Sequence, residues 1–446
     1  IFSGQSNMKS ISSAAQRSVG EVVAAQGEEY LPIYVAQPGK PIEAWLDPDH
    51  RDYKLWTELS EKIGAARETG ARFRGFVWYQ GESNAGSGAG QYQQQLTELV
   101  ARVRKATGDA ELPVIVIQIG SATSYSGKDW AAATVREAQR RFVRDDPHAA
   151  LVTAIDAEIG DYTVHLSQEG AQVVAQRIAA AARHLAYGAK DAYWGPQFHQ
   201  AYFAGKDRRN VIVEFNSVQD ELQLGDGWLT GFGASGQTKL PDRLADMQDA
   251  LVLGHLPDDY IYPMGGGQLD SRRLFVTFSQ PLPEGARLSY AAQRNAQYGP
   301  HRRWGLEFTG VKDASGHQTP AFVLTPIEPA RVVSLPKTKP LEPLQQEWRQ
   351  LAVNCIGRYP AAVTKPNDQA GWAQHDWRQP YWNPASSGLV PNLFDSTGNV
   401  TSVGFVSGVW YMSPYFSELK NSDDALMASW CKHRLHEFSG LEPKKP

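Results

Sequence analysis

Hydrophobic and polar positions follow two different patterns along the chain, and the change falls near residue 187. Up to that point, short apolar runs alternate with longer segments of helical period, as in a parallel sheet with crossover helices. The apolar runs predict strands at an opening stub, residues 1–2, and at residues 31–36, 73–79, 114–117 and 151–155. The periodic segments predict helices at residues 53–67, 91–106, 129–143 and 168–186. We therefore expect a first domain of α/β class over residues 1–187.

The pattern after residue 188 is that of a β-rich domain. Short alternating runs, separated by Gly, Pro and Asp, replace the alanine-rich helical segments. Residues 210–215 and 274–278 have strand propensity with turn signals on both sides, as in a β-sandwich. We predict an accessory domain of sandwich or jelly-roll type over residues 188–340. Residues 341–446 are irregular and rich in aromatic side chains, and we expect this region to pack on the other two.

Composition excludes several classes of protein. The 446 residues are 42% hydrophobic and 21% charged with a net charge of -4, so there is no basic excess to bind a phosphate backbone. No apolar run approaches the roughly 20 residues that a membrane-spanning helix requires. We therefore expect neither nucleic acid nor a membrane as a partner, and the sequence leaves the oligomeric state open. Cys355 and Cys431 could form one bridge or remain two thiols.

A serine follows the first predicted strand, in the run Gly4-Gln5-Ser6-Asn7-Met8. That position lies at the carboxyl edge of the sheet, where α/β folds place their sites. A helix beginning just after Ser6 would add positive potential to a charge that develops on an attacked carbonyl. By itself a Gly-x-Ser run is weak evidence, since a serine also caps helices.

Three further strand ends carry groups that complement a nucleophilic serine. After the second strand, Gly39 offers a backbone N–H that a substrate can approach closely, although a plain turn would also use glycine. After the third strand, Asn84, with Gln80 second, could donate a side-chain N–H to an oxyanion, and Glu82 could orient a histidine or bind substrate. After the fifth strand, His165 stands just before the last predicted helix and is the natural base.

These segments resemble the SGNH hydrolase superfamily, in particular its sialate O-acetylesterase-like and acetylxylan-esterase-like branch. The resemblance rests on residues 4–8, 78–84 and 164–166, and it covers roughly the first 187 residues. The β-rich segment that follows is similar to the accessory domain of sialate esterases. The resemblance implies a three-layer α/β/α, flavodoxin-like fold, with Ser6 as nucleophile and His165 as base. It also implies a reaction that needs neither a metal nor another cofactor.

The resemblance further implies an oxyanion hole and a substrate. The N–H groups of Ser6 and Gly39, with the segment around Asn84, would hold the oxyanion. The residues expected to contact substrate are Gln5, Gln80 and Glu82. The substrate would be an acetylated carbohydrate, such as sialic acid, xylan or xyloglucan, deacetylated through an acetyl-enzyme. The resemblance also implies a bacterial protein that is periplasmic or secreted, whose signal peptide would have preceded the opening strand stub.

One position departs from the superfamily pattern. The acid that steadies the histidine usually stands three residues before it, but Tyr162 occupies that position and Asp161 stands four before. We rank Asp161 first as the third member of the triad, because a bulge could bring it to the imidazole. Glu82 is the alternative acid, and a backbone carbonyl serving a Ser-His dyad is another.

Two interpretations from other classes stay open. A lipid or thioester hydrolase could use the same catalytic residues, and a non-catalytic carbohydrate-binding protein could keep the same fold. The displaced Asp161 motivates the second of these. Residues 371–382 mix aromatic rings with hydrogen-bonding groups, as sugar-binding surfaces do, but a loop anchored by its aromatic side chains would have the same composition.

Overall fold

The structure is a computed structural model of the chain. It describes residues 1–121, 129–160, 164–224, 231–235, 260–261, 263–278, 281–292 and 310–336, together with the backbone of five short strands beyond them. The chain divides into two compact units, of which the first holds residues 1–297 and 309–335 and the second residues 298–308 and 336–446. The domain boundaries at 187 and 340 remain predictions, because the first unit contains both the α/β layers and the sheets that follow them.

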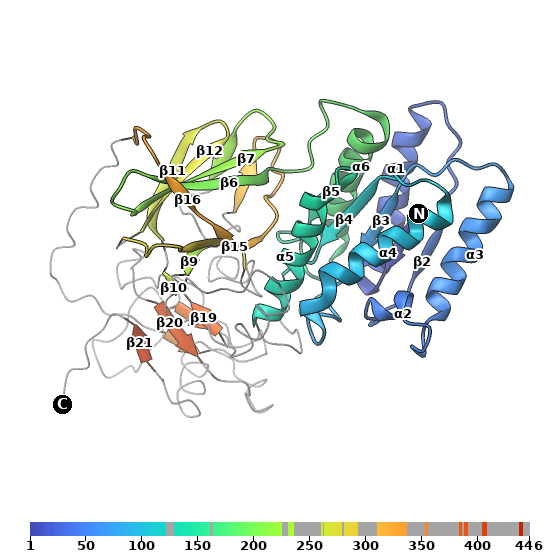
Figure 1. Cartoon of the computed structure of the whole chain (residues 1–446), viewed down its shortest axis with the longest axis horizontal. Helices are drawn as coiled ribbons and strands as arrows, with labels where there is room; N and C mark the ends of the chain where they lie inside the picture. The colour runs from blue at the N-terminus through green and yellow to red at the C-terminus, as the bar shows by residue number, and fades with distance from the viewer. Residues whose placement is uncertain are drawn as a thin grey trace, which may run out of the picture. The chain divides into compact units, whose positions relative to one another are not determined.

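The N-terminal part is a parallel sheet of five strands in the order β2-β1-β3-β4-β5 (Figure 1). The strands are β1 (Phe2–Gly4), β2 (Tyr34–Ala36), β3 (Phe76–Tyr79), β4 (Val114–Gln118) and β5 (Ala149–Thr153). Every residue of β3 and β4 is buried, which is why these strands read as continuous apolar runs. The sheet confirms the predicted α/β class.

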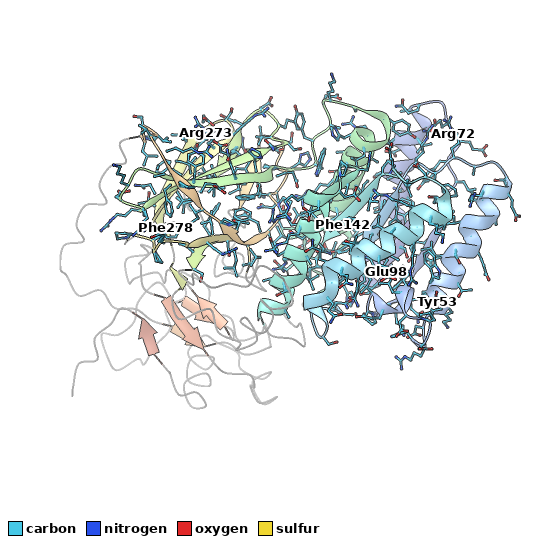
Figure 2. All side chains as sticks on the ribbon, in the orientation of Figure 1. Tyr53, Arg72, Glu98, Phe142, Arg273 and Phe278 are labelled. Atoms are coloured by element: carbon cyan, nitrogen blue, oxygen red, sulfur yellow. The ribbon has the colours of Figure 1, made fainter. Side chains whose placement is uncertain are left out.

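Helices cover the sheet in two groups. They are α1 (Ser6–Ala24), α2 (Glu43–Leu46), α3 (Lys54–Glu68), α4 (Tyr92–Thr107), α5 (Asp129–Asp145) and α6 (Gln168–Tyr187), with a short 3₁₀ turn η1 (Ala89–Gln91). Helix α1 packs against α6, whereas α3 packs against α4 and α4 against α5. Figure 2 shows the described side chains filling the space between these layers, and Phe142 of α5 belongs to the buried core there. None of the helices in the described part of the chain is long and apolar enough to cross a membrane.

Two mostly antiparallel sheets follow α6 and confirm the predicted β-rich class. One has the order β10-β9-β13-β15 and the other β11-β12-β7-β6-β16, while β8 pairs with β14. The strands are β6 (Gln197–Ala204), β7 (Asn210–Asn216), β8 (Leu222–Leu224), β9 (Phe232–Ser235), β10 (Tyr260–Ile261), β11 (Pro263–Asp270), β12 (Arg273–Phe278), β13 (Arg287–Tyr290), β14 (Val311–Asp313), β15 (Phe322–Pro326) and β16 (Glu328–Arg331).

Five short strands are described in the second unit: β17 (Val353–Cys355), β18 (Asn383–Ala385), β19 (Gly388–Val390), β20 (Gly404–Ser407) and β21 (Glu437–Ser439). Cys355 ends β17, but its side chain, like Cys431 and the aromatic segment 371–382, lies outside the described residues. Whether the two cysteines form a bridge, and whether that segment binds sugar, therefore stay open.

Buried polar contacts join the β-rich part of the first unit to the α/β layers. The Gln118 side chain, at the end of β4, donates to the Ala321 carbonyl at 2.8 Å and accepts from the Ala321 N–H at 2.7 Å. The Val323 N–H donates to Glu137 of α5 at 3.0 Å. Gln118 and Glu137 are almost fully buried, so each bond satisfies a polar group that water cannot reach.

Candidate active site

Ser6 stands at the first turn of α1, directly after β1. Gly4 makes that turn with φ +149°, and a Cβ there would lie 2.0 Å from the carbonyl oxygen of Tyr79 on β3. The Gln5 N–H donates to the same oxygen at 3.0 Å. Only glycine allows this close approach, which brings half-buried Ser6 to the carboxyl edge of the sheet and to the positive end of a helix of 19 residues.

The residue after the serine, Asn7, connects this helix to two other strand ends. Its Nδ2 donates to Glu82 Oε1 at 2.6 Å and to the Val164 carbonyl at 3.0 Å, and its Oδ1 accepts from the Leu166 N–H at 3.2 Å. Val164 and Leu166 flank His165. The structure therefore brings the serine, glutamate and histidine segments together at one sheet edge, as the strand-end argument predicted.

Glu82 is a buried carboxyl group close to the proposed base. Burial raises its pKa, while the hydrogen bond from Asn7 and the positive charges of His165 and Arg136 act in the opposite direction. Its second oxygen, Oε2, has no hydrogen-bond partner among the residues that the structure describes. A buried carboxyl with a shifted pKa beside a histidine is typical of functional sites. Asp161, our first choice for the acid, lies outside the described residues.

Gly39 lies in an exposed turn after β2 and has φ +69°. No atom lies within 4 Å of the place that a Cβ would occupy, so the backbone conformation is what favours glycine here. The turn is tied to the nucleophile's strand, because the Gln37 N–H donates to the Gly4 carbonyl at 3.1 Å. Gly39 therefore follows a strand end that neighbours the serine, and its role in the oxyanion hole stays a prediction.

The amide of Asn84 is fully buried, and both its oxygen and its nitrogen make hydrogen bonds. Its Oδ1 accepts from Gln80 Nε2 at 2.7 Å and from the Ile42 N–H at 3.0 Å, and its Nδ2 donates to Glu43 Oε2 at 3.0 Å. These contacts hold the loop after β2 against the loop after β3. The prediction that Asn84 also donates to an oxyanion stays a prediction, and the described contacts assign this amide a structural task.

The buried amide of Gln5 differs from that of Asn84, because only its oxygen makes hydrogen bonds to the described residues. It is 3% exposed, and its Oε1 accepts from Gln80 Nε2 at 3.1 Å and from the Ser83 N–H at 3.2 Å. These bonds fix which way the amide faces. Among the described residues none accepts a hydrogen bond from Gln5 Nε2, so this group can bind a ligand, as we expected for Gln5.

Comparison with protein families matches residues 14–184 to the model described as carbohydrate esterase, sialic acid-specific acetylesterase. Residues 14–184, which make up most of the α/β part of the chain, are therefore similar to this carbohydrate esterase family. The matched range begins after Ser6, so the nucleophile's assignment depends on the geometry above. A comparison with curated proteins found no match.

Solved structures show likeness to this esterase domain and the sheets after it. A carbohydrate acetylesterase from Xanthomonas citri aligns with a TM-score of 0.53 and 22% identity over 70% of this chain, which spans 64% of that protein's length. At that identity the likeness shows the fold alone. A protein from Arabidopsis thaliana aligns with a TM-score of 0.33 and 22% identity, covering 38% of this chain and 67% of its own.

Arg136 is a buried arginine of the α/β layers that the sequence analysis did not single out. It is fully buried on α5, donates through Nε to the Ile119 carbonyl at 3.0 Å and through Nη2 to the Gly120 carbonyl at 2.5 Å, and its charge acts on Glu82. The sequence feature that could have identified Arg136 is its position one turn after Ala132, on the buried face of the helix. An arginine on an apolar stripe is a candidate for a functional role.

A metal site is a separate possibility for any cluster of acidic residues and histidines. Within the described ranges no group of three or more His, Cys, Asp or Glu side chains is placed to hold a metal ion. The expectation of metal-independent chemistry stays a prediction that follows from the resemblance.

Proposed function

We propose that the protein is a serine esterase that removes O-acetyl groups from a carbohydrate through an acetyl-enzyme. The observation that carries the proposal is the set of hydrogen bonds from Asn7 that joins the serine's helix to Glu82 and to both sides of His165. Similarity of residues 14–184 to the esterase family supports ester hydrolysis and a carbohydrate substrate.

The proposed reaction begins when His165 takes the proton of Ser6, which attacks the acetyl carbonyl. The N–H groups of Ser6 and Gly39, with Asn84 as the expected side-chain donor, stabilise the tetrahedral oxyanion, and the positive end of α1 adds to that stabilisation. The oxyanion collapses to an acetyl-enzyme as His165 gives the proton to the departing sugar hydroxyl. His165 then activates water, which releases acetate and restores the serine.

The acid behind His165 is proposed to be Asp161 or Glu82. The second is supported by geometry, since Asn7 binds Glu82 and the backbone on both sides of His165. Asp161→Asn and Glu82→Gln separate the alternatives, because the variant that removes the true acid should lower kcat by about 10⁴. The other variant should keep most of the activity. If Ser6 and His165 act as a dyad without a carboxylate, both variants should keep most of the activity.

The decisive test of the proposed function is Ser6→Ala assayed with an aryl acetate and with acetylated sugars. Loss of the nucleophile should lower kcat by about 10⁶. Ser13→Ala is a matched control, because Ser13 lies on the same helix with an exposed side chain, and it should retain normal turnover. Normal hydrolysis by Ser6→Ala would overturn the assignment.

The acetylated glycan itself follows from measuring acetate release across acetylated sialosides, xylan and xyloglucan. Turnover that rises with acyl chain length would favour the lipid or thioester hydrolase instead. Sugar binding without acetate release would favour the non-catalytic protein. A glycan substrate outside the cell would agree with the expected periplasmic or secreted location.

A further inference from the structure

Asn7 makes three hydrogen bonds to parts of the chain far from it in sequence. Glu82 is 75 residues away, and the Val164 carbonyl and the Leu166 N–H are 157 and 159 residues away. The side chain is 1% exposed, so these contacts are made where water does not compete. Asn7 directly follows the proposed nucleophile, Ser6, on the first turn of α1.

The two backbone contacts of Asn7 lie on either side of the proposed base. Val164 precedes His165 and Leu166 follows it, so one side chain fixes the backbone both before and after the imidazole-bearing residue. Other backbone contacts of this segment come from its own loop, where the Gly160 N–H donates to the His165 carbonyl at 2.9 Å and Ile159 pairs with Leu166. Asn7 thus connects this loop to the nucleophile's helix.

Resting on the proposed function, we propose that Asn7 is a positioning residue that fixes His165 relative to the nucleophile. Through Nδ2 it also holds one oxygen of Glu82, whose second oxygen, Oε2, has no hydrogen-bond partner among the described residues. The position requires two N–H donors and one acceptor in a short planar group, and asparagine supplies that set. Because the three hydrogen bonds of this buried side chain are all made within the protein, Asn7 acts through His165.

The test uses Asn7→Asp, which has nearly the same shape and keeps an acceptor for the Leu166 N–H. It lacks both N–H donors and sets a second carboxyl group 2.6 Å from Glu82, the separation of the present hydrogen bond. A misplacement of about 1 Å costs about 10² in rate. We expect kcat to fall by about 10² with KM close to the wild-type value, since substrate contacts are unchanged.

The pH profile supplies a readout that a merely structural role would not change. Two carboxyl groups this close share a proton, and the shared proton reproduces the lost donor. When the pH rises and that proton leaves, the contact turns repulsive, although the positive charge of Arg136, and that of His165 while it is protonated, act on Glu82 and delay the change. The kcat of Asn7→Asp should therefore fall further at alkaline pH, where the wild type stays level.

Ser3→Ala is the matched control for loss of a buried hydrogen bond near the site. Ser3 is fully buried on β1 and donates to the Val35 carbonyl at 2.6 Å, away from the histidine loop. It should unfold at a lower temperature than the wild type and keep both kcat and the pH profile. Asn7→Ala removes all three hydrogen bonds, so its activity is informative only if a thermal melt shows that the variant folds. Asn7→Asp is therefore the variant that tests the positioning role.

Two negative results are distinguishable. If the wild type hydrolyses esters through Ser6 and Asn7→Asp keeps its kcat and pH profile, the inference about Asn7 is wrong and the proposed function stands. If the wild type hydrolyses no ester and a fluorophosphonate probe does not label Ser6, the proposed function fails and the inference fails with it. A loss of kcat equally large in Ser3→Ala would also overturn the positioning role.

Discussion

Replacing Arg177 with leucine should strongly destabilise the α/β part of the chain. The change leaves the buried carboxylate of Asp156 without the positive charge that it pairs with. Arg177 on α6 donates through Nη1 to Asp156 Oδ1 at 2.7 Å and through Nη2 to Oδ2 at 2.9 Å, and Nη1 also donates to the Thr153 carbonyl at 2.9 Å. The arginine side chain is 1% exposed and that of Asp156 is 9% exposed. Solvent screening is therefore weak, and the partner left behind has little access to water.

Removing one member of such a buried pair costs about 3–5 kcal/mol in the free energy of unfolding. Urea titration followed by tryptophan fluorescence measures this loss. Arg183→Leu is the matched control, since Arg183 lies on the same helix and is exposed, and it should change stability by less than about 0.5 kcal/mol. The double variant Arg177→Leu with Asp156→Asn removes the stranded charge as well, so it should be more stable than Arg177→Leu alone.

The loss should also depend on pH. Burial by itself would raise the pKa of Asp156, but the charge and hydrogen bonds of Arg177 outweigh burial and hold that pKa below its usual value. The pair therefore contributes stability that is present above the unfolded-state pKa of about 3.9 and is lost as the pH falls through the folded-state pKa. The difference between wild type and Arg177→Leu should be largest near neutral pH and shrink in acid. A loss below about 1 kcal/mol, or one independent of pH, would refute this reasoning.

Two further predictions concern the turns that hold the site. Gly4→Ala would place a Cβ 2.0 Å from the Tyr79 carbonyl oxygen, so it should abolish activity or folding. Gly64→Ala in α3 is the control, because open space surrounds that position. It should stabilise the protein by about 0.5–1 kcal/mol in a thermal melt. An active Gly4→Ala protein would contradict the close approach. Ser167 caps α6 by accepting from the Gly170 N–H at 3.0 Å, so Ser167→Ala should cost about 1 kcal/mol in urea unfolding, and an unchanged midpoint would contradict the cap.

Strands and helices of the first domain could be predicted because burial imposes a period on the sequence. The predicted strand at 114–117 ends one residue before β4 does, and the predicted helix at 91–106 begins and ends one residue before α4. The predicted strand at 73–79 begins three residues before β3, because hydrophobic Phe73 packs against the core without pairing in the sheet. Apolar character predicts burial, and only pairing partners decide where a strand begins.

The convergence of the site could be predicted for the same reason, since the carboxyl ends of parallel strands meet at one edge. The hydrogen-bond partner of each side chain could not be predicted from the sequence. Asn84 was assigned to the oxyanion, but its Nδ2 meets Glu43, a residue of a helix too short to leave a periodic signal. Asn7 was read as part of a serine motif, and its contacts with Val164 and Leu166 depend on loops that lie side by side only after folding.

The two-way pairing of Gln118 with Ala321 has a practical consequence for anyone who expresses the esterase domain alone. A chain cut after Tyr187 would lose Ala321, Val323 and the Ala291 carbonyl, to which Arg136 donates at 3.3 Å. Gln118, Glu137 and Arg136 would then keep polar groups without their partners on a newly exposed apolar face, which favours aggregation. The shortest well-behaved fragment should extend to Leu335, where the first compact unit ends.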